Sequence, residues 1–234
     1  MALFIVFEGL DGAGKTTQAE ELGRRLLRAT GKPSTVVHEP GGTALSEAIG
    51  HLLKRAYWVH PVPEAELLLF AASRSQLVQE VIRPTLAQHH QSAVIADRFT
   101  ASTVAYQGYG RGVSLEMIKY LQDYATSRLS PDLTILLDIE PTKGLQRKRP
   151  TISNGVQLEL FDGASYDRFE SMNLEFFDRV RKGYLELAAH SVEHHVEKWA
   201  VIPADSEIEV VSEAVWRHVE PLLGIGNKCT QAPF

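Results

Sequence analysis

The sequence predicts an α/β fold in which one central parallel sheet of five strands is flanked by helices. Two observations predict it. Short apolar runs alternate with longer amphipathic segments, and a glycine-rich phosphate-binding loop lies between the first run and the first segment. The runs are rich in Val, Ile and Leu without clear polar alternation, which is typical of strands buried on both faces of a parallel sheet.

The individual elements follow from local patterns in chain order. Strands are expected at the apolar runs Ala2–Phe7, Thr35–Val37, Ala93–Ala96, Leu133–Ile139 and Trp199–Ile202. Helices are expected at the amphipathic segments, which are approximately Lys15–Arg28, Ala44–Arg55, Glu64–Gln88, Leu115–Ser127, Asp167–His190 and Glu207–Leu222. Gly31 and Pro33 end the first helix, and Pro84 interrupts the third near its end.

Domain organisation follows from the absence of any repeat, low-complexity stretch or interdomain linker in the sequence. We expect residues 1–224 to form one domain, followed by a loose tail at residues 225–234. The segment Pro150–Ser165 fits no regular pattern and follows the basic cluster Gln146–Arg149. Long irregular insertions are usually surface loops or lids, so a lid is expected at about residues 147–166, with a passive insertion as the alternative.

Composition limits the class of protein. The chain has 234 residues, of which 44% are hydrophobic, and its 24 basic and 29 acidic residues give a net charge of −5. This balance argues against a general surface for nucleic acid or anionic membranes. The single cysteine, Cys229, excludes an intramolecular disulfide, and the apolar run ending before Glu8 is too short to span a bilayer. We therefore expect a cytoplasmic protein with neither nucleic acid nor membrane as a partner.

The phosphate-binding motif Gly-x-x-x-x-Gly-Lys-Thr follows a strand and opens a helix, as its function requires. Gly12 and Gly14 allow the backbone to approach phosphate oxygens, Lys15 reaches the β- and γ-phosphates, and Thr16 supplies a hydroxyl to Mg²⁺. The motif predicts that ATP binds at Gly9, Leu10, Asp11, Gly12, Ala13, Gly14, Lys15, Thr16 and Thr17. A GTPase-type switch is disfavoured, because the only Asn-Lys pair, Asn227-Lys228, lies in the tail without the required aspartate.

A second group of candidate residues follows the predicted strands. Asp97 and Arg98 end a buried strand, where ligands bind in open α/β sheets. Asp97 is a candidate ligand of Mg²⁺ or of its water, and Arg98 a candidate phosphate clamp. A salt bridge that caps the next helix is the alternative. Glu39 ends the second strand before a Pro-Gly-Gly turn, and alone it is weak evidence of function.

A possible base-binding pair lies on the third predicted helix. Phe70 and Arg74 are four residues apart and share a helix face, so a ring and a guanidinium could contact one base. Taken alone, Phe70 is better explained as a core residue and Arg74 as a surface residue. Just past Arg98, Ser102, Thr103, Tyr106 and Gln107 add hydroxyl and amide groups, which could equally be helix caps.

Together these blocks resemble bacterial thymidylate kinase. The resemblance is carried by FEGLDGAGKTTQ, HEPGGT, LLLFAASRSQLVQEVIRPTL, DRFTASTVAYQGYGRG and DRFE…YLELA, and it runs from about Leu3 to Leu222. It implies a P-loop nucleotide kinase fold with a lid, and transfer of the γ-phosphoryl group of ATP to dTMP. It also implies Mg²⁺ as cofactor and a homodimer.

The resemblance also implies roles for the second group of residues. Phe70 would stack on thymine and Arg74 would bond its edge, while Tyr106 would sit against the deoxyribose. Arg98 would clamp the acceptor phosphate, and Asp11 would face the sugar hydroxyl of the acceptor instead of the ATP phosphates. The full dTMP-binding set is Asp11, Glu39, Phe70, Arg74, Arg98, Ser102, Thr103, Tyr106 and Gln107.

The family comparison gives Ala13 a meaning. Some relatives carry a catalytic arginine at this loop position, and others have a small residue there and supply an arginine from the lid. This chain is similar to the second kind, so Arg147 and Arg149 join Lys15 and Arg98 as catalytic candidates. We favour Arg149 for the transition state, because it borders the irregular segment. Two departures are the histidine before Glu39, in place of a common arginine, and a lid some ten residues longer than in many relatives.

The nearest rival is a deoxynucleoside kinase that phosphorylates thymidine, for which Glu39 could serve as the general base. A monophosphate acceptor needs no such base, because its second pKa is about 6 and it is already anionic near neutral pH. The Gly-Gly-Thr after Pro40 and the intact Ala-Tyr-Gln-Gly block favour the monophosphate.

Overall fold

The structure is a computed structural model that describes residues 2–54, 59–148, 172–194 and 198–224. Five parallel strands form one sheet, as expected from the sequence, and the structure shows their order to be β2-β3-β1-β4-β5. The strands are β1 (Leu3–Glu8), β2 (Ser34–His38), β3 (Ala93–Asp97), β4 (Leu133–Asp138) and β5 (Trp199–Pro203).

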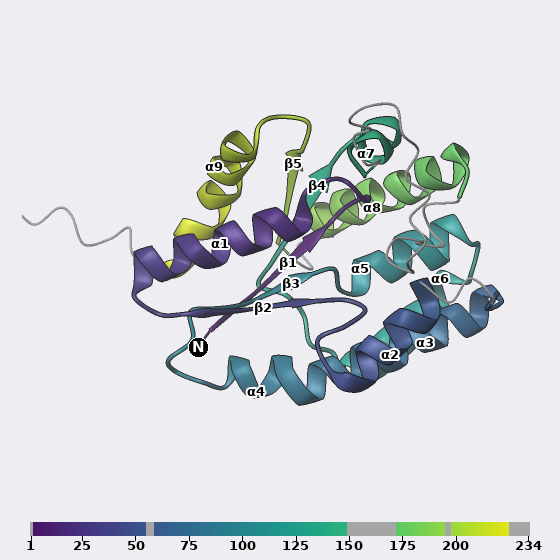
Figure 1. Ribbon diagram of the computed structural model, residues 1–234, viewed down its shortest axis with the longest axis horizontal. Helices are drawn as coiled ribbons and strands as arrows, with labels where there is room; N and C mark the ends of the chain where they lie inside the picture. The colour runs from purple at the N-terminus through teal and green to yellow at the C-terminus, as the bar shows by residue number, and fades with distance from the viewer. Residues whose placement is uncertain (1, 55–58, 149–171, 195–197, 225–234) are drawn as a thin grey trace, which may run out of the picture.

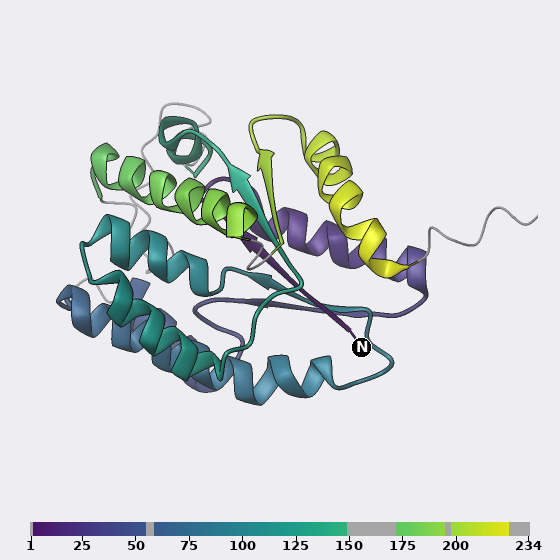
Figure 2. The ribbon, with the colours of Figure 1, turned by 180° about the vertical axis from the view of Figure 1, so that it is seen from behind.

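Helices cover both faces of the sheet (Figures 1 and 2). On one face α1 (Lys15–Thr30) packs beside α9 (Ile208–Val219), and α8 (Leu174–His194) crosses the other. The other helical segments are α2 (Ala44–Lys54), α3 (Pro63–Leu77), the π-helical η1 (Val78–Ile82), α4 (Arg83–Leu86), α5 (Thr100–Thr103), the π-helical η2 (Val104–Gly110), α6 (Leu115–Thr126), α7 (Pro141–Lys148) and the 3₁₀ turn η4 (Glu220–Leu223).

Two predicted helix boundaries have clear physical causes. Gly31 ends α1 in a left-handed conformation, and its N–H donates to the carbonyl of Leu27. The third predicted helix is interrupted near Pro84, but the chain stays helical there. The wider π turn η1 precedes the proline and relieves the clash between its ring and the preceding turn.

Other boundaries differ from the sequence prediction. The helix predicted at Asp167–His190 corresponds to α8, which begins at Leu174. The side chain of Asn173 caps it by accepting from the N–H of Phe176 at 3.0 Å. The helical segments α5, η2 and α7 were not among the predicted helices. The first two are short and rich in small residues, and α7 is only eight residues long. Most of the expected lid, including Arg149, and the expected tail lie outside the described residues.

The sheet aligns the carboxyl ends of its three neighbouring strands β2, β3 and β1. Asp97 pairs in register with Phe7 on β1 and with His38 on β2. The ladder continues one residue further, because the N–H of Arg98 donates to the Phe7 carbonyl at 2.9 Å and that of Glu39 to the Asp97 carbonyl at 3.0 Å. Three segments far apart in the chain therefore present Glu8, Arg98 and Glu39 at one edge of the sheet.

Candidate active site

The phosphate loop connects β1 to α1 and is held by its own backbone and by its neighbours. Gly9 adopts a φ of 135° and passes so close to the Leu137 carbonyl on β4 that any side chain would collide with it. Gly14 caps α1 in a left-handed conformation, and the side chain of Lys15 folds back to donate to the Leu10 carbonyl at 2.8 Å. The loop is therefore preformed, with the N-terminus of α1 directed at its cavity.

Lys15 is buried in this loop. Burial, and to a lesser extent the nearby charge of Arg98, lower its pKa to about 8, although Asp97, Asp11 and Glu8 act in the opposite direction. A buried ammonium at the N-terminus of a helix is a suitable site for phosphate oxygens, which would restore its charge balance.

The residues expected to hold Mg²⁺ lie together. The hydroxyl of Thr16 donates to Asp97 Oδ2 at 2.5 Å, beside the phosphate loop. One hydroxyl and one carboxylate suit a hard cation that also takes phosphate oxygens and water as ligands. The described residues contain no cluster of three or more His, Cys, Asp or Glu side chains that could hold a metal alone. The pair Thr16 and Asp97 therefore fits an ion that arrives with a nucleotide.

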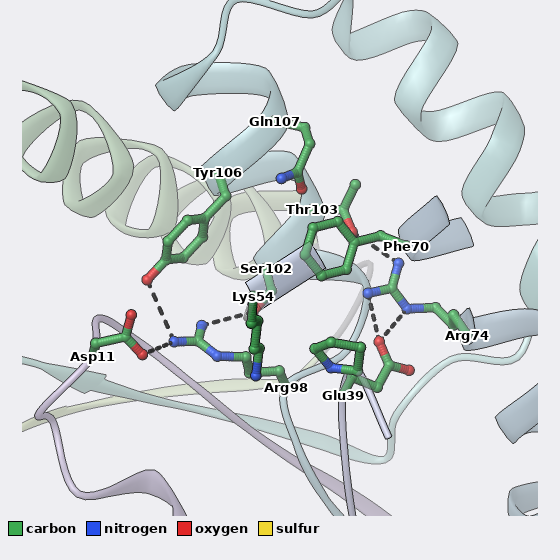
Figure 3. A pocket seen from close by; sticks show the side chains of 11 residues that line it. Asp11, Glu39, Lys54, Phe70, Arg74, Arg98, Ser102, Thr103, Tyr106 and Gln107 are labelled. Atoms are coloured by element: carbon green, nitrogen blue, oxygen red, sulfur yellow. Dashed lines mark hydrogen bonds and ion pairs between the residues drawn. The ribbon is translucent and has the colours of Figure 1, made fainter. Parts of the chain in front are cut away.

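Arg98 lies at the centre of the site. It has a φ of 76°, a conformation that non-glycine residues rarely adopt. Its guanidinium forms an ion pair with Asp11 at 2.6 Å and donates to Ser102 Oγ at 3.0 Å and to the hydroxyls of Tyr184 and Tyr106 at 3.2 and 3.3 Å. Strained backbone that the surroundings hold in place is frequent at functional sites, and here it points the guanidinium into the cavity (Figure 3).

The buried carboxylate of Glu8 holds the turn that follows Arg98 in the chain. Glu8 accepts the N–H of Phe99 at 2.9 Å and that of Ser102 at 3.1 Å, and its other oxygen accepts from Ser102 Oγ at 2.6 Å and Tyr184 Oη at 3.0 Å. Burial raises the pKa of Glu8, and the bond from Ser102 and the charge of Arg98 counteract that rise. Glu8 therefore fixes the turn that carries Arg98.

A second cavity opens on the other side of Arg98 (Figure 3). Every residue expected to bind dTMP lines it. Its walls are Asp11, Glu39, Pro40, Lys54, Phe70, Arg74, Arg98, Ser102, Thr103, Tyr106 and Gln107. The ring of Phe70 faces the cavity from α3, and Tyr106 faces it from η2. The structure thus brings the expected residues together from four separate segments of the chain.

Arg74 has little contact with solvent in this cavity, since it is only 1% exposed. It donates to Glu39 Oε2 through Nε at 2.7 Å, to Thr103 Oγ1 and Gln122 Oε1 through one terminal nitrogen at 2.9 and 2.6 Å, and to the Phe99 carbonyl through the other at 2.9 Å. Every nitrogen of the guanidinium therefore has a protein acceptor. A ligand at this site would share a donor with the protein.

Glu39 is the counter-ion of Arg74. Burial raises its pKa to about 7, although the adjacent guanidinium lowers it. Its Oε1 is buried without a hydrogen-bond partner in the described residues. The group therefore changes protonation near neutral pH, and a proton on this carboxyl would meet a buried oxygen that accepts no hydrogen bond within the described residues.

A further cavity follows the phosphate loop and contains Arg147. Its lining includes Gly12, Gly14, Lys15, Thr16, Thr17, Asp97 and Arg147, and it shares Asp11, Glu39, Lys54 and Arg98 with the base-side cavity. Arg147 on α7 donates to the Ala204 carbonyl, in the loop after β5, at 2.6 Å. The structure thus places Arg147 in the wall of the cavity beside the phosphate loop.

Sequence reasoning missed several residues of the site. Glu8 had a signal, because a carboxylate ending a buried apolar strand is unusual. Lys54 at the end of α2 lines both cavities, and Glu66, Gln122 and Tyr184 hold site residues from α3, α6 and α8. These helical positions carry no local motif.

The comparisons with known proteins agree with this geometry. A family profile described as thymidylate kinase matches residues 7–215. The chain is 40% identical over 221 residues to a thymidylate kinase of Desulforudis audaxviator, covering 94% of this chain and 91% of that one. It is 46% identical over 186 residues to one of Pelodictyon phaeoclathratiforme, covering 79% and 82%. The crystal structure of thymidylate kinase from Ehrlichia chaffeensis matches with a TM-score of 0.70 and 30% identity, over 93% of this chain and 98% of that one.

A parallel five-stranded sheet, a phosphate loop and an adjoining base-sized cavity define a P-loop nucleotide kinase. Within that class, the chain belongs to the thymidylate kinase family.

Proposed function

We propose that this protein transfers the γ-phosphoryl group of ATP to dTMP, giving ADP and dTDP. One observation carries the proposal: the base-side cavity and the phosphate-loop cavity meet at Arg98 and share four of their lining residues. A nucleoside monophosphate in the first cavity would therefore present its phosphate to the γ-phosphate of a nucleotide in the second. The family of the chain identifies the pair as dTMP and ATP.

In this reaction a phosphate oxygen of the acceptor attacks the γ-phosphorus, and the bond from that phosphorus to the β–γ bridging oxygen of ATP breaks. No group has to remove a proton, because the acceptor phosphate is already ionised. Arg98 would hold the acceptor phosphate and Lys15 the β- and γ-phosphates, so the protein contributes alignment and charge neutralisation. Mg²⁺, held by Thr16 and Asp97, would supply further positive charge at the phosphate oxygens.

We assign the transition-state arginine to the lid. The phosphate loop has Ala13 where a cation could stand, and Ala13 is buried. Arg147 is bonded to the loop after β5 on the donor side, which suits a role toward ATP. This leaves Arg149, outside the described residues, as the proposed cation at the transferred phosphoryl group. The lid at 147–166 would belong to a single kinase domain spanning residues 1–224.

We also propose a cytoplasmic homodimer. Within the described part of the chain, no helix combines the length and apolar character needed to cross a membrane. Helices α2, α3 and α6 expose large apolar side chains, which include Leu45, Leu52, Leu68, Leu115, Met117, Tyr120 and Tyr124. A second copy covering this face would remove them from water.

The experiment that tests the function compares two acceptors. Purified protein with ATP and Mg²⁺ is expected to form ADP much faster with dTMP than with thymidine, because only the monophosphate can use Arg98. Comparable or faster turnover of thymidine would instead make Glu39 a general base and the protein a nucleoside kinase.

A further inference from the structure

Gln107, in the wall of the base-side cavity, is held by a fully buried carboxylate. Its Nε2 donates to Glu66 Oε1 at 2.7 Å, and Glu66 is 0% exposed. Arg111, which directly follows η2, approaches the same carboxylate from the other side, with an ion-pair distance of 3.1 Å to Oε2. Arg111, Glu66 and Gln107 thus form a chain of contacts that leads from a partly exposed arginine to the wall of the cavity.

This contact determines which end of the Gln107 amide faces the cavity. An ionised carboxylate only accepts hydrogen bonds, so the nitrogen of the amide must turn toward Glu66 and its oxygen away from it. The assignment follows from chemistry and does not depend on telling nitrogen from oxygen by position. The amide end of Gln107 points into the space between the rings of Tyr106 and Phe70 (Figure 3). The oxygen is therefore offered to a bound base as an acceptor.

We propose that Glu66 is a positioning residue that sets base selectivity through Gln107. The inference rests on the proposed function and deepens it. A thymine or uracil ring carries an N–H at position 3, which can donate to the fixed amide oxygen. Cytosine carries an acceptor at that position, so two acceptors would face each other. An amide free to turn over would serve both bases, and Glu66 prevents that turn.

The size of the effect follows from leaving buried polar groups unpaired. Facing acceptors lose the hydrogen bond and keep the cost of desolvation, which corresponds to at least about tenfold in relative kcat/KM. Glu66→Gln can donate or accept, so Gln107 could then adopt either orientation. The preference for dTMP over dCMP should fall about tenfold in this variant.

The experiment measures kcat/KM for dTMP and dCMP in a cycle of variants. Glu66→Gln should lower the dTMP to dCMP ratio in the otherwise unchanged protein, and should leave the ratio unchanged when Gln107 is already replaced by leucine. Glu66→Gln with Arg111→Met leaves no guanidinium without a partner and should show the same fall, so the test survives if the single variant does not fold. Glu64→Gln, on an exposed position of the same helix, should have no effect.

The outcomes separate this inference from the proposed function. An unchanged ratio in folded Glu66→Gln, or an equal fall in the Gln107→Leu background, would overturn the positioning role while dTMP kinase activity stands. An unmodified protein that fails to phosphorylate dTMP would overturn the proposed function itself.

Discussion

At the scale of single residues, the site depends on ionisable groups that are buried together. Arg74 and Glu39 are the clearest pair, at 1% and 5% exposure and 2.6 Å apart. A buried pair is weak evidence of net stabilisation, but the removal of one partner is costly because the other charge stays behind without solvent.

Arg74→Ala should therefore destabilise the fold by about 3–5 kcal/mol at pH 8. At pH 5.5 the loss should be smaller, because Glu39 can then bind a proton. The folded pKa of Glu39, about 7, lies above the ordinary value of 4.5, so its stabilising contribution is complete below pH 4.5 and is lost as pH rises through 7. Without Arg74 the folded pKa rises further, which enlarges the loss at high pH. Urea unfolding of the variant and of the unmodified protein at both pH values measures this loss in the free energy of unfolding.

The control for this prediction is Arg74→Ala combined with Glu39→Gln. The glutamine does not titrate, so the destabilisation caused by Arg74→Ala should be nearly the same at pH 5.5 and at pH 8 in this background. A destabilisation by Arg74→Ala that is equal at both pH values would contradict the role of Glu39. Because both residues line the base-side cavity, KM for dTMP should rise more than KM for ATP.

Lys15 gives the second prediction at this scale. Its folded pKa, about 8, lies below the ordinary 10.5, so its contribution to stability is present above pH 10.5 and is lost as pH falls through 8. Its charge, which phosphate requires, has the opposite pH dependence. The affinity of the free protein for a non-hydrolysable ATP analogue should therefore fall as pH rises from 7.5 to 9.5. Lys15→Arg, which stays charged, should show no such fall. Constant affinity of the unmodified protein up to pH 9.5 would exclude a lowered pKa.

The residues of the site were predictable from the sequence where they belong to a motif. Lys15, Thr16 and Asp97 follow from strand–loop–helix chemistry, and Phe70 and Tyr106 from resemblance to a family. The network that holds them was not predictable. Glu66 and Gln107 are separated by 41 residues, and Glu8 and Tyr184 by 176, so only the folded chain brings them together.

At the scale of elements, the phosphate loop rests on the helix α7. Any side chain at Gly12 would collide with the carbonyl of Gly144, and a Cβ at Gly144 would lie 2.6 Å from the carbonyl of Asp11. Both neighbours are backbone atoms of packed segments, so moving either one away from an added side chain would cost considerable free energy. The path of the loop is therefore set partly by the helix that begins the expected lid.

Gly144→Ala tests this contact, because two effects have opposite signs. Alanine favours a helix by about 1 kcal/mol over glycine, so propensity alone would stabilise α7. The clash should instead displace the loop and lower kcat/KM for ATP by about 10²-fold, the usual result of a 1 Å misplacement. Gln146→Ala, on an exposed position of α7, should keep full activity. Unchanged activity in Gly144→Ala would show that the loop does not depend on the helix.

Prediction from the sequence succeeded for the strands and failed for some of the helical segments, each for an identifiable reason. The five strands were found because buried parallel strands are continuous apolar runs. The turns α5 and η2 contain small polar residues and glycines without an apolar period, although they carry Ser102, Tyr106 and Gln107. The cap of α8 at Asn173 was not predicted, because the charged residues from Asp167 onward resemble a first helical turn.

At the scale of the whole molecule, α2, α3 and α6 pack side by side, away from α1 and α9 (Figures 1 and 2). Their outer surface includes Tyr124 at 81% exposure, Tyr120 at 69% and Leu68 at 55%. Tyrosine and leucine so exposed are unusual on a monomer when several gather on neighbouring helices. Stable dimers bury about 800 Å² per partner, an area that three helices can supply.

Sedimentation should therefore give twice the chain mass of 26.0 kDa. Tyr120→Glu would bring two like charges into a two-fold interface and should shift the protein to the monomer, since charges buried without partners oppose association. Leu27→Glu is the matched control, because Leu27 is also half exposed but lies on α1, across the sheet. A dimer that survives Tyr120→Glu but not Leu27→Glu would move the interface to the α1 face. If the unmodified protein sediments as a monomer, the proposed dimer is wrong, and the exposed apolar side chains of α6 do not form an interface with a second copy of the chain.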